Sequence, residues 1–443
     1  MSSGALEDEP ASSTGKSGSG SGWLMRFVGA AVAIGLLWLA ARNVPWEDQL
    51  LVRMELESAS GESAAGKSVF AVEGDLVGDW KDPTVGFQVH PNALAAAQEE
   101  QATAWNQLPP RLREELEAGG ELNLSEDLVR WADGSQLALP GLEWRPAIGR
   151  VFADLRWTAL LPALGLLVLC TLFIVTRWWV LLRAMRCGTR WLSAMRVTYV
   201  GLFFNVIFPG SSGGDLARAW LVVKGYPDRR ADAFMSVILD RLLGLVAMGL
   251  VAAVAVFSND ERFAVLRLPV GLVAAGMIVG IGALGSRRLR RWIRLDQWIE
   301  RMPLGNRIAR LDQAIRTLSS HRVQVALAVV LSVGNHLGAA MAIATLGTAL
   351  GADLSLLDYV CIATVVNTLT AVPISLGGLG VGEVLSGTLF AWAGDSYTLG
   401  VATSVTFRIC LALLGLAGGL VLLAPGGRQM RSEFQEAERE LEA

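Results

Sequence analysis

Two groups of charged residues lie inside otherwise apolar stretches of this chain. The first group holds Asp215 and Arg218, followed by the adjacent residues Asp240 and Arg241. An acid and a base three residues apart on a helix can form an ion pair. Within a bilayer a central charge costs about 2.5–3.5 kcal/mol, so such a residue faces protein or water and has a partner. We therefore expect these side chains to line a polar interior.

The second group consists of Glu383 and Arg408, which lies near the middle of the last apolar stretch. We expect Glu383 to pair with Arg408 or with Arg241. A purely structural role for these charges, holding helices in register, stays open beside direct contact with a ligand.

A break rich in proline and glycine precedes each group. Residues 208–214 read Phe-Pro-Gly-Ser-Ser-Gly-Gly, and residues 372–382 read Val-Pro-Ile-Ser-Leu-Gly-Gly-Leu-Gly-Val-Gly. Such backbone at membrane depth is tolerated only where it lines protein or a wet cavity. Glycine lets backbone approach a ligand, and a helix that starts near Gly214 would direct free N–H groups at an anion such as a phosphate. Asn205 and Asn367, one before each break, would either satisfy freed backbone groups or contact the ligand.

The elements that must position these residues are membrane helices. The 443 residues are 52% hydrophobic and only 18% charged, whereas soluble proteins carry about 25% charged residues. Long apolar runs fit the roughly 20 helical residues that a bilayer core requires; they span residues 160–175, 237–257, 266–284, 323–350 and 399–423. A further span, residues 23–42, follows a disordered tail of residues 1–22. We interpret it as an uncleaved anchor, with a cleaved signal peptide as the alternative.

The distribution of arginine predicts the orientation, because short loops rich in Lys and Arg stay in the cytoplasm. Both flanks of residues 199–223 are basic, and both flanks of residues 358–392 are poor in basic residues. We therefore expect one hairpin to enter from each side of the membrane and return to it. The predicted fold is an all-α polytopic membrane protein with two opposed re-entrant helical hairpins, related as an inverted repeat. Such broken segments point to a transporter site at the repeat interface, which we expect to be a polar cavity between the two hairpins.

Other basic residues have simpler interpretations. Arg177 and Arg183 flank the inner end of a span beside two tryptophans, and we expect them to be interfacial anchors. Residues 287–322 are rich in arginine; they either lie on an anionic lipid surface or only fix the orientation. We expect the spans to lie in the inner cell membrane. Both termini, including the tail of residues 426–443, are expected in the cytoplasm.

Residues 43–156 form a polar insert between the first and second spans, on the extracytoplasmic side. Strand patterns cover residues 50–56, 69–72 and 84–89, and a helix is indicated over residues 108–118. We predict a small α+β domain. It shows no catalytic constellation, and its role, including a partner in the cell envelope, is left open.

The sequence gives no indication of cofactor, metal or enzyme chemistry. Its three histidines lie far apart, at His90, His321 and His336, and its four cysteines lie in or beside apolar runs. No phosphate-binding loop and no Asp-x-Asp motif are present. We expect no cofactor, no metal, no enzymatic activity and no nucleic-acid partner.

The two breaks and their charges resemble the lysylphosphatidylglycerol synthase transmembrane-region family, a flippase-like module also called the uncharacterised 0104 family. The resemblance covers residues 157–425 and rests on residues 205–218, Asp240-Arg241-Leu242 and residues 373–383, in this order. The positions that fall on the family's pattern are Pro209, Gly214, Asp215, Arg218, Arg241, Pro373, Gly377, Gly378, Gly380 and Glu383. Bifunctional members continue into an aminoacyltransferase domain, whereas this chain ends at Ala443, so lysine transfer is not expected. The insert is not part of the family's module.

The resemblance implies movement of a lipid headgroup, of an anionic phospholipid or a polyprenyl-linked lipid. Arg218, Arg241 and Arg408 would bind the phosphate, with Asp215 and Glu383 as counter-charges or proton carriers. The full candidate set is Asn205, Pro209, Gly213, Gly214, Asp215, Arg218, Asp240, Arg241, Asn367, Pro373, Gly377, Gly378, Gly380, Glu383 and Arg408. The alternatives are a transporter of small soluble solutes, an enzyme acting on lipid-linked substrates, and a scaffold acting through the insert. The oligomeric state, a homo-oligomer included, is left open.

Overall fold

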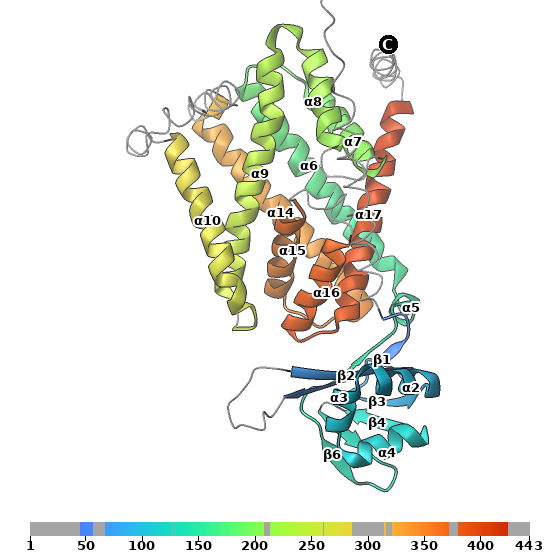
Figure 1. Ribbon diagram of the computed structural model, residues 1–443. Coiled ribbons are helices and arrows are strands. Elements are labelled where there is room, and N and C mark those ends of the chain that lie inside the picture. The colour runs from blue at the N-terminus through green and yellow to red at the C-terminus, as the bar shows by residue number, and fades with distance from the viewer. Residues whose placement is uncertain are drawn as a thin grey trace, which may run out of the picture.

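The computed structural model in Figure 1 describes residues 45–55, 67–125, 127–207, 213–259, 261–285, 314–315, 321–371 and 380–423. The predicted first span, both tails and nearly all of residues 287–322 lie outside these ranges. So do residues 208–212 and 372–379 of the two breaks, and with them Pro209, Pro373, Gly377 and Gly378.

Five long helices carry the membrane part of the described chain. They are α6 (Leu160–Ala184), α9 (Arg230–Ser258), α10 (Ala264–Gly285), α14 (Arg322–Leu350) and α17 (Tyr397–Leu423). Each is long and apolar enough to cross a bilayer. Large apolar side chains such as Leu272, Val330 and Leu420 are about two-thirds exposed on the outside of this bundle, as lipid contact requires. The five predicted spans that fall in the described residues are confirmed.

Two pairs of shorter helices separate the long ones. The first pair is α7 (Trp191–Ile207) with α8 (Gly213–Gly225), and the second is α15 (Leu356–Ala371) with α16 (Val381–Ala393). With 13 to 17 residues, each helix is shorter than the roughly 20 residues of a full span. In Figure 1 the α15–α16 pair lies at the end of the bundle next to the insert, and α7–α8 lies toward the opposite end. A long helix, a short pair and a long helix therefore follow one another twice, with α10 between the two sets.

The insert is built on one antiparallel sheet with the strand order β6-β5-β4-β3-β2-β1-β7. The strands are β1 (Asp48–Glu55), β2 (Lys67–Val77), β3 (Thr84–Val89), β4 (Glu121–Ser125), β5 (Leu128–Arg130), β6 (Gln136–Ala138) and β7 (Leu142–Arg145). Its helices are α2 (Pro91–Glu100), α3 (Ala102–Gln107), α4 (Pro110–Ala118) and α5 (Ile148–Ala153). The predicted α+β insert is confirmed: β1, β2, β3 and α4 match the predicted elements, and the other elements are additions.

Alternation along the strands explains which face of the sheet is covered. On β2, Val72 and Leu76 are buried, whereas Glu73 and Asp75, which lie between them, are exposed. Successive side chains of a strand point to opposite faces, so one face packs in the core and the other meets solvent. Leu112 and Leu116 of α4 are almost completely buried in the same core.

The insert and the membrane helices share one buried cluster. Ile148 and Val151 of α5 belong to the same cluster as Leu350 of α14 and Phe390 of α16. The Arg145 guanidinium lies 5.4 Å from the centre of the Tyr397 ring at the start of α17. The insert is therefore seated on the ends of α14, α16 and α17 rather than attached only through its connecting chain.

The insert carries an exposed histidine whose charge should affect stability. His90 Nε2 lies 2.9 Å from Asp75 Oδ2, and its Nδ1 lies 3.1 Å from Glu47 Oε2. The hydrogen bond to Asp75, together with the charges of both acids, raises the pKa of His90 above its ordinary value of 6.5. A raised pKa in the folded state adds stability at low pH, and this stability is lost as the pH rises through that pKa.

We expect His90→Gln to reduce the stability of the full-length protein at pH 5.5 and to change it little at pH 8.5. The effect should be small, because exposed ion pairs contribute about 0.2–1 kcal/mol. Thermal unfolding in detergent at both pH values measures it. Equal destabilisation by the substitution at pH 5.5 and 8.5 would contradict the assignment.

Candidate functional site

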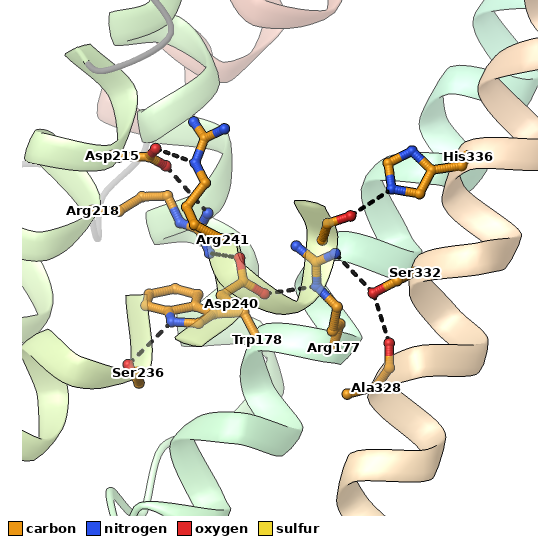
Figure 2. A network of polar contacts seen from close by, with 11 residues as sticks. Arg177, Trp178, Asp215, Arg218, Ser236, Asp240, Arg241, Ala328, Ser332 and His336 are labelled. Atoms are coloured by element: carbon orange, nitrogen blue, oxygen red, sulfur yellow. Dashed lines mark hydrogen bonds and ion pairs between the residues drawn. The ribbon is translucent and has the colours of Figure 1, made fainter. Parts of the chain in front are cut away.

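A buried carboxylate joins the helices of the first half. Asp240 of α9 is 1% exposed. Its Oδ1 accepts a hydrogen bond of 2.7 Å from Arg177 Nε of α6, and its Oδ2 accepts one of 3.3 Å from Arg218 Nη2 of α8. Arg177 Nη1 also donates to Ser332 Oγ of α14 at 3.0 Å. Figure 2 shows this network linking the four helices.

Arg218 fills the space around its carboxylate partner. Its guanidinium lies 4.3 Å from the centre of the Trp178 ring, a cation–π contact. Its aliphatic part runs along Gly201 of α7, where a Cβ would come within 2.8 Å of Arg218 Cγ. The Trp178 indole N–H donates to Ser236 Oγ at 3.3 Å. A glycine at position 201 is therefore required for Arg218 to reach Asp240.

Asp215 forms a second, more accessible contact. Arg241 Nε donates to Asp215 Oδ2, and Arg218 Nη1 lies 3.7 Å from Asp215 Oδ1. The Arg241 side chain is 46% exposed, in contrast to its buried neighbour Asp240. Asp215 lies in the first turn of α8, where the helix dipole favours an acid.

Asn205 connects the two helices of the first pair. Its Oδ1 accepts a hydrogen bond of 2.7 Å from the Gly214 N–H at the start of α8. The interpretation that Asn205 satisfies a backbone group freed by the break is confirmed. The helix itself begins at Gly213.

In the second half, Glu383 pairs with Arg408. Glu383 Oε1 lies 2.5 Å from Arg408 Nε of α17, and Oε2 accepts a hydrogen bond of 2.7 Å from the Gly380 N–H. Gly380 precedes α16 with a φ of +80°, a conformation that favours glycine. A Cβ at position 382 would come within 2.5 Å of Arg408 Nη2. Of the two predicted partners of Glu383, the structure selects Arg408, since Arg241 pairs with Asp215.

A cavity of about 170 Å³ lies beside Arg408, among α14, α15, α16 and α17. Its polar lining residues are Asn367, Thr370, Ser386, Thr403, Ser404 and Arg408. The remaining walls are apolar and include Ile343, Phe390 and Phe407. Asn367, predicted as a second capping or ligand-binding amide, thus lies at the cavity.

The two acid–arginine contacts have the same placement in their helices. Asp215 is the third residue of α8, counted from Gly213, and Glu383 is the third residue of α16, counted from Val381. Arg241 is the twelfth residue of α9, counted from 230, and Arg408 is the twelfth of α17, counted from 397. The same arrangement is therefore built twice in one chain.

The structure sorts the described candidates into two separate groups. One group holds Asn205, Gly213, Gly214, Asp215, Arg218, Asp240 and Arg241, and the other holds Asn367, Gly380, Glu383 and Arg408. Within the described ranges, no cluster of three or more metal-ligating side chains occurs.

Arg177 was missed, because the prediction of an interfacial anchor is wrong for it. Its side chain is 7% exposed and ion-paired with Asp240. The apolar run ends at residue 175, which placed Arg177 at a span end, but α6 continues to Ala184. Two further turns of helix place this arginine inside the bundle. Arg183 is exposed and lies over the Trp179 ring, as an interfacial anchor does.

We expect Asp240→Asn to destabilise the protein by about 3–5 kcal/mol, because it leaves two buried arginines without their shared carboxylate. Asp232→Asn on the same helix is the matched control. Asp232 is 44% exposed and pairs with Arg229, so its loss should cost less than about 1 kcal/mol. Thermal unfolding of both variants in detergent measures the difference. Similar costs for the two substitutions would show that the Asp240 network does not hold the helices together.

The model of the family described as the lysylphosphatidylglycerol synthase TM region matches residues 137–419. The match contains both short helix pairs and both charged groups, and it begins inside the insert rather than at the expected boundary of residue 157. No curated protein and no solved structure matched. Because the match covers more than half of the chain, this multi-pass membrane protein belongs to the lysylphosphatidylglycerol synthase transmembrane-region family.

Proposed function

We propose that this protein moves the headgroup of an anionic or glycosylated lipid across the membrane, while the acyl chains stay in lipid. The observation that carries the proposal is the cavity beside the Arg408–Glu383 pair, enclosed by helices of a membrane bundle. It holds a charged residue and hydrogen-bonding groups at a depth where lipid alone offers none. We propose a transporter without enzymatic activity.

The chemistry of the cavity suits a phosphate-bearing headgroup. A guanidinium binds phosphate through two parallel hydrogen bonds. Asn367 and the hydroxyls of Ser386, Thr403 and Ser404 line the same space and can bind further oxygens. The volume of about 170 Å³ is several times the roughly 30 Å³ that one water molecule occupies in the liquid.

The repeated arrangement supports an inverted repeat with re-entrant hairpins. In the first half α8 contacts α9, and α7 contacts α17; in the second half α16 contacts α17, and α15 contacts α9. Every one of these contacts has a counterpart when α6–α9 is exchanged with α14–α17. We propose that α7–α8 enters from the cytoplasm of a cell and α15–α16 from the outer side of its inner membrane, with both termini cytoplasmic. Binding near the interface of such repeats suits alternating access.

Glu383 acts as the counter-charge that an incoming phosphate displaces from Arg408. Its second hydrogen bond, from the Gly380 N–H, keeps the carboxylate seated at the start of α16 while Arg408 binds the ligand. Without a phosphate, the pair keeps the arginine neutralised among membrane helices.

The position of the insert favours transport over an independent scaffold role. Its core is continuous with the ends of α14, α15, α16 and α17, the helices that enclose the cavity. A partner in the cell envelope that binds the insert would therefore act on the helices of the transport site.

We expect Glu383→Gln to abolish headgroup translocation in proteoliposomes that contain fluorescent lipids, with an impermeant quencher added outside. With wild-type protein, the quenched fraction of the fluorescence should exceed the fraction of labelled lipid in the outer leaflet. With the variant, the quenched fraction should equal that of protein-free liposomes. The matched control is Glu261→Gln, whose side chain is 86% exposed and pairs with Arg267; it should behave as wild type.

The lipids should include anionic phospholipids and glycan-linked polyprenyl lipids, with thermal unfolding as the test of folding. Wild-type translocation by a folded Glu383→Gln variant would contradict the role of Glu383. If none of these lipids is translocated and a labelled soluble solute is taken up instead, the transported substrate is a soluble solute and not a lipid.

A further inference from the structure

The cavity beside Arg408 has a counterpart in the first half, which can be located by counting along the helices. Ser236 and Thr403 are the seventh residues of α9 and α17 (230 to 236 and 397 to 403). Arg218 and Ser386 are the sixth residues of α8 and α16 (213 to 218 and 381 to 386).

Trp178 corresponds to Ile343 by the same method. Each lies thirteen residues before the next short helix (178 to 191 and 343 to 356). Ile343 lines the cavity, as do the second-half counterparts of Arg218 and Ser236.

In the first half the corresponding space is filled with side chains. Arg218 stacks on Trp178, and the Trp178 indole donates to Ser236, as Figure 2 shows. In the second half the smaller side chains of Ser386 and Ile343 stand at these positions. The cavity is therefore the volume that an arginine and a tryptophan occupy in the other half.

In the first half, ion pairs hold the side chain that fills the space in place. Arg218 is 6% exposed and paired with Asp240, which Arg177 also contacts. Moving Arg218 away would leave buried charges without full compensation, which is strongly unfavourable.

A buried hydroxyl at the cavity lacks a partner. Thr403 is 1% exposed, and its Oγ1 makes no hydrogen bond within the described part of the chain. The equivalent hydroxyl of Ser236 receives the Trp178 indole N–H and donates to the Ala233 carbonyl. Buried hydroxyls are normally hydrogen-bonded, and Thr403 lines the cavity, so a group that enters the cavity can supply the partner of this hydroxyl.

We propose that the cavity is a binding pocket for a phosphoester that carries hydroxyl groups, and that its first-half counterpart is permanently filled and binds no ligand. Arg408 binds the phosphate, and the Thr403 hydroxyl binds a hydroxyl of the ligand. In the first half the side chains of Arg218 and Trp178 fill the corresponding space, and in the second half the bound ligand fills it. The assignment of this ligand as a lipid headgroup rests on the proposed function, whereas the pocket itself rests on the geometry above.

Binding to full-length protein in detergent tests the pocket without a transport assay. The probes are glycerol 3-phosphate and dihexanoyl-phosphatidylglycerol, which share a phosphoester and hydroxyls but differ in their acyl chains. Isothermal titration gives the affinity, and the ligand-induced rise in Tm gives a second measure. If the short-chain lipid binds, whether or not glycerol 3-phosphate also binds, the ligand of the pocket is a lipid headgroup. If only glycerol 3-phosphate binds, the pocket is supported and its ligand is a soluble phosphoester.

Ile343→Trp transfers the first-half side chain to the second half. We expect the indole to fill the cavity and reach Thr403, which should raise the Tm of the free protein and abolish binding of both probes. Wild-type affinity in a folded Ile343→Trp variant would overturn the proposal. Failure of both probes to bind the wild type would overturn it as well.

Thr403→Val decides the question if the tryptophan variant does not fold. Removing an unpartnered buried hydroxyl should raise the Tm of the free protein, whereas loss of its bond to the ligand should weaken binding roughly tenfold. Ser236→Ala is the matched control: it removes a satisfied hydroxyl, so it should lower the Tm and leave the affinity unchanged. A purely structural role for Thr403 predicts an unchanged affinity, which would overturn the proposal.

Failure of the pocket and failure of the proposed function give different results. Probe binding that depends on Thr403, without translocation, would keep the pocket and reject transport. Translocation that requires Glu383, with neither probe bound, would reject the pocket and keep transport.

Discussion

A charge buried among membrane helices needs a partner, and this requirement organises the bundle. Asp240 satisfies it for two arginines at once, one from α6 and one from α8, and Arg177 passes the contact on to Ser332 of α14. Loss of one member would leave the others buried without full compensation. The positions of four helices are therefore tied to one carboxylate.

The second half meets the same requirement with fewer charges. Among the described residues its ion pair, Glu383 and Arg408, stands where the first half has Asp215 and Arg241. The buried triad of the first half has no counterpart at the matching positions, because Ser386 stands at the place of Arg218 and Phe407 at the place of Asp240, the eleventh residue of its helix in each case. The halves therefore differ in the side chains at these positions, and an open volume lies beside the arginine of the second half. A duplicated scaffold with one filled and one open site explains both the symmetry of the helices and the asymmetry of their charges.

Most of the helix order was predictable from hydropathy and charge, because long apolar runs and glycine-rich breaks are local features of sequence. The Asp215–Arg218 contact and the Glu383–Arg408 pair followed from spacing and from the cost of a central arginine. The role of Arg177 did not, since a span that includes an arginine resembles a shorter span with an interfacial one. A polar cavity was expected between the two hairpins, but its place among α14, α15, α16 and α17 could not be predicted. It depends on Ile343, Ser386 and Thr403, whose types are ordinary and whose proximity arises only from the packing of the helices.

The central claim is that a headgroup passes Arg408 on its way across the membrane. Headgroup accessibility in proteoliposomes, measured with the Arg408→Gln variant beside the wild type, tests it most directly. The account predicts that the variant folds but leaves inner-leaflet label as protected as in protein-free liposomes, because the cavity beside it then offers no cation to the phosphate. Translocation at the wild-type rate by the folded variant would contradict the account.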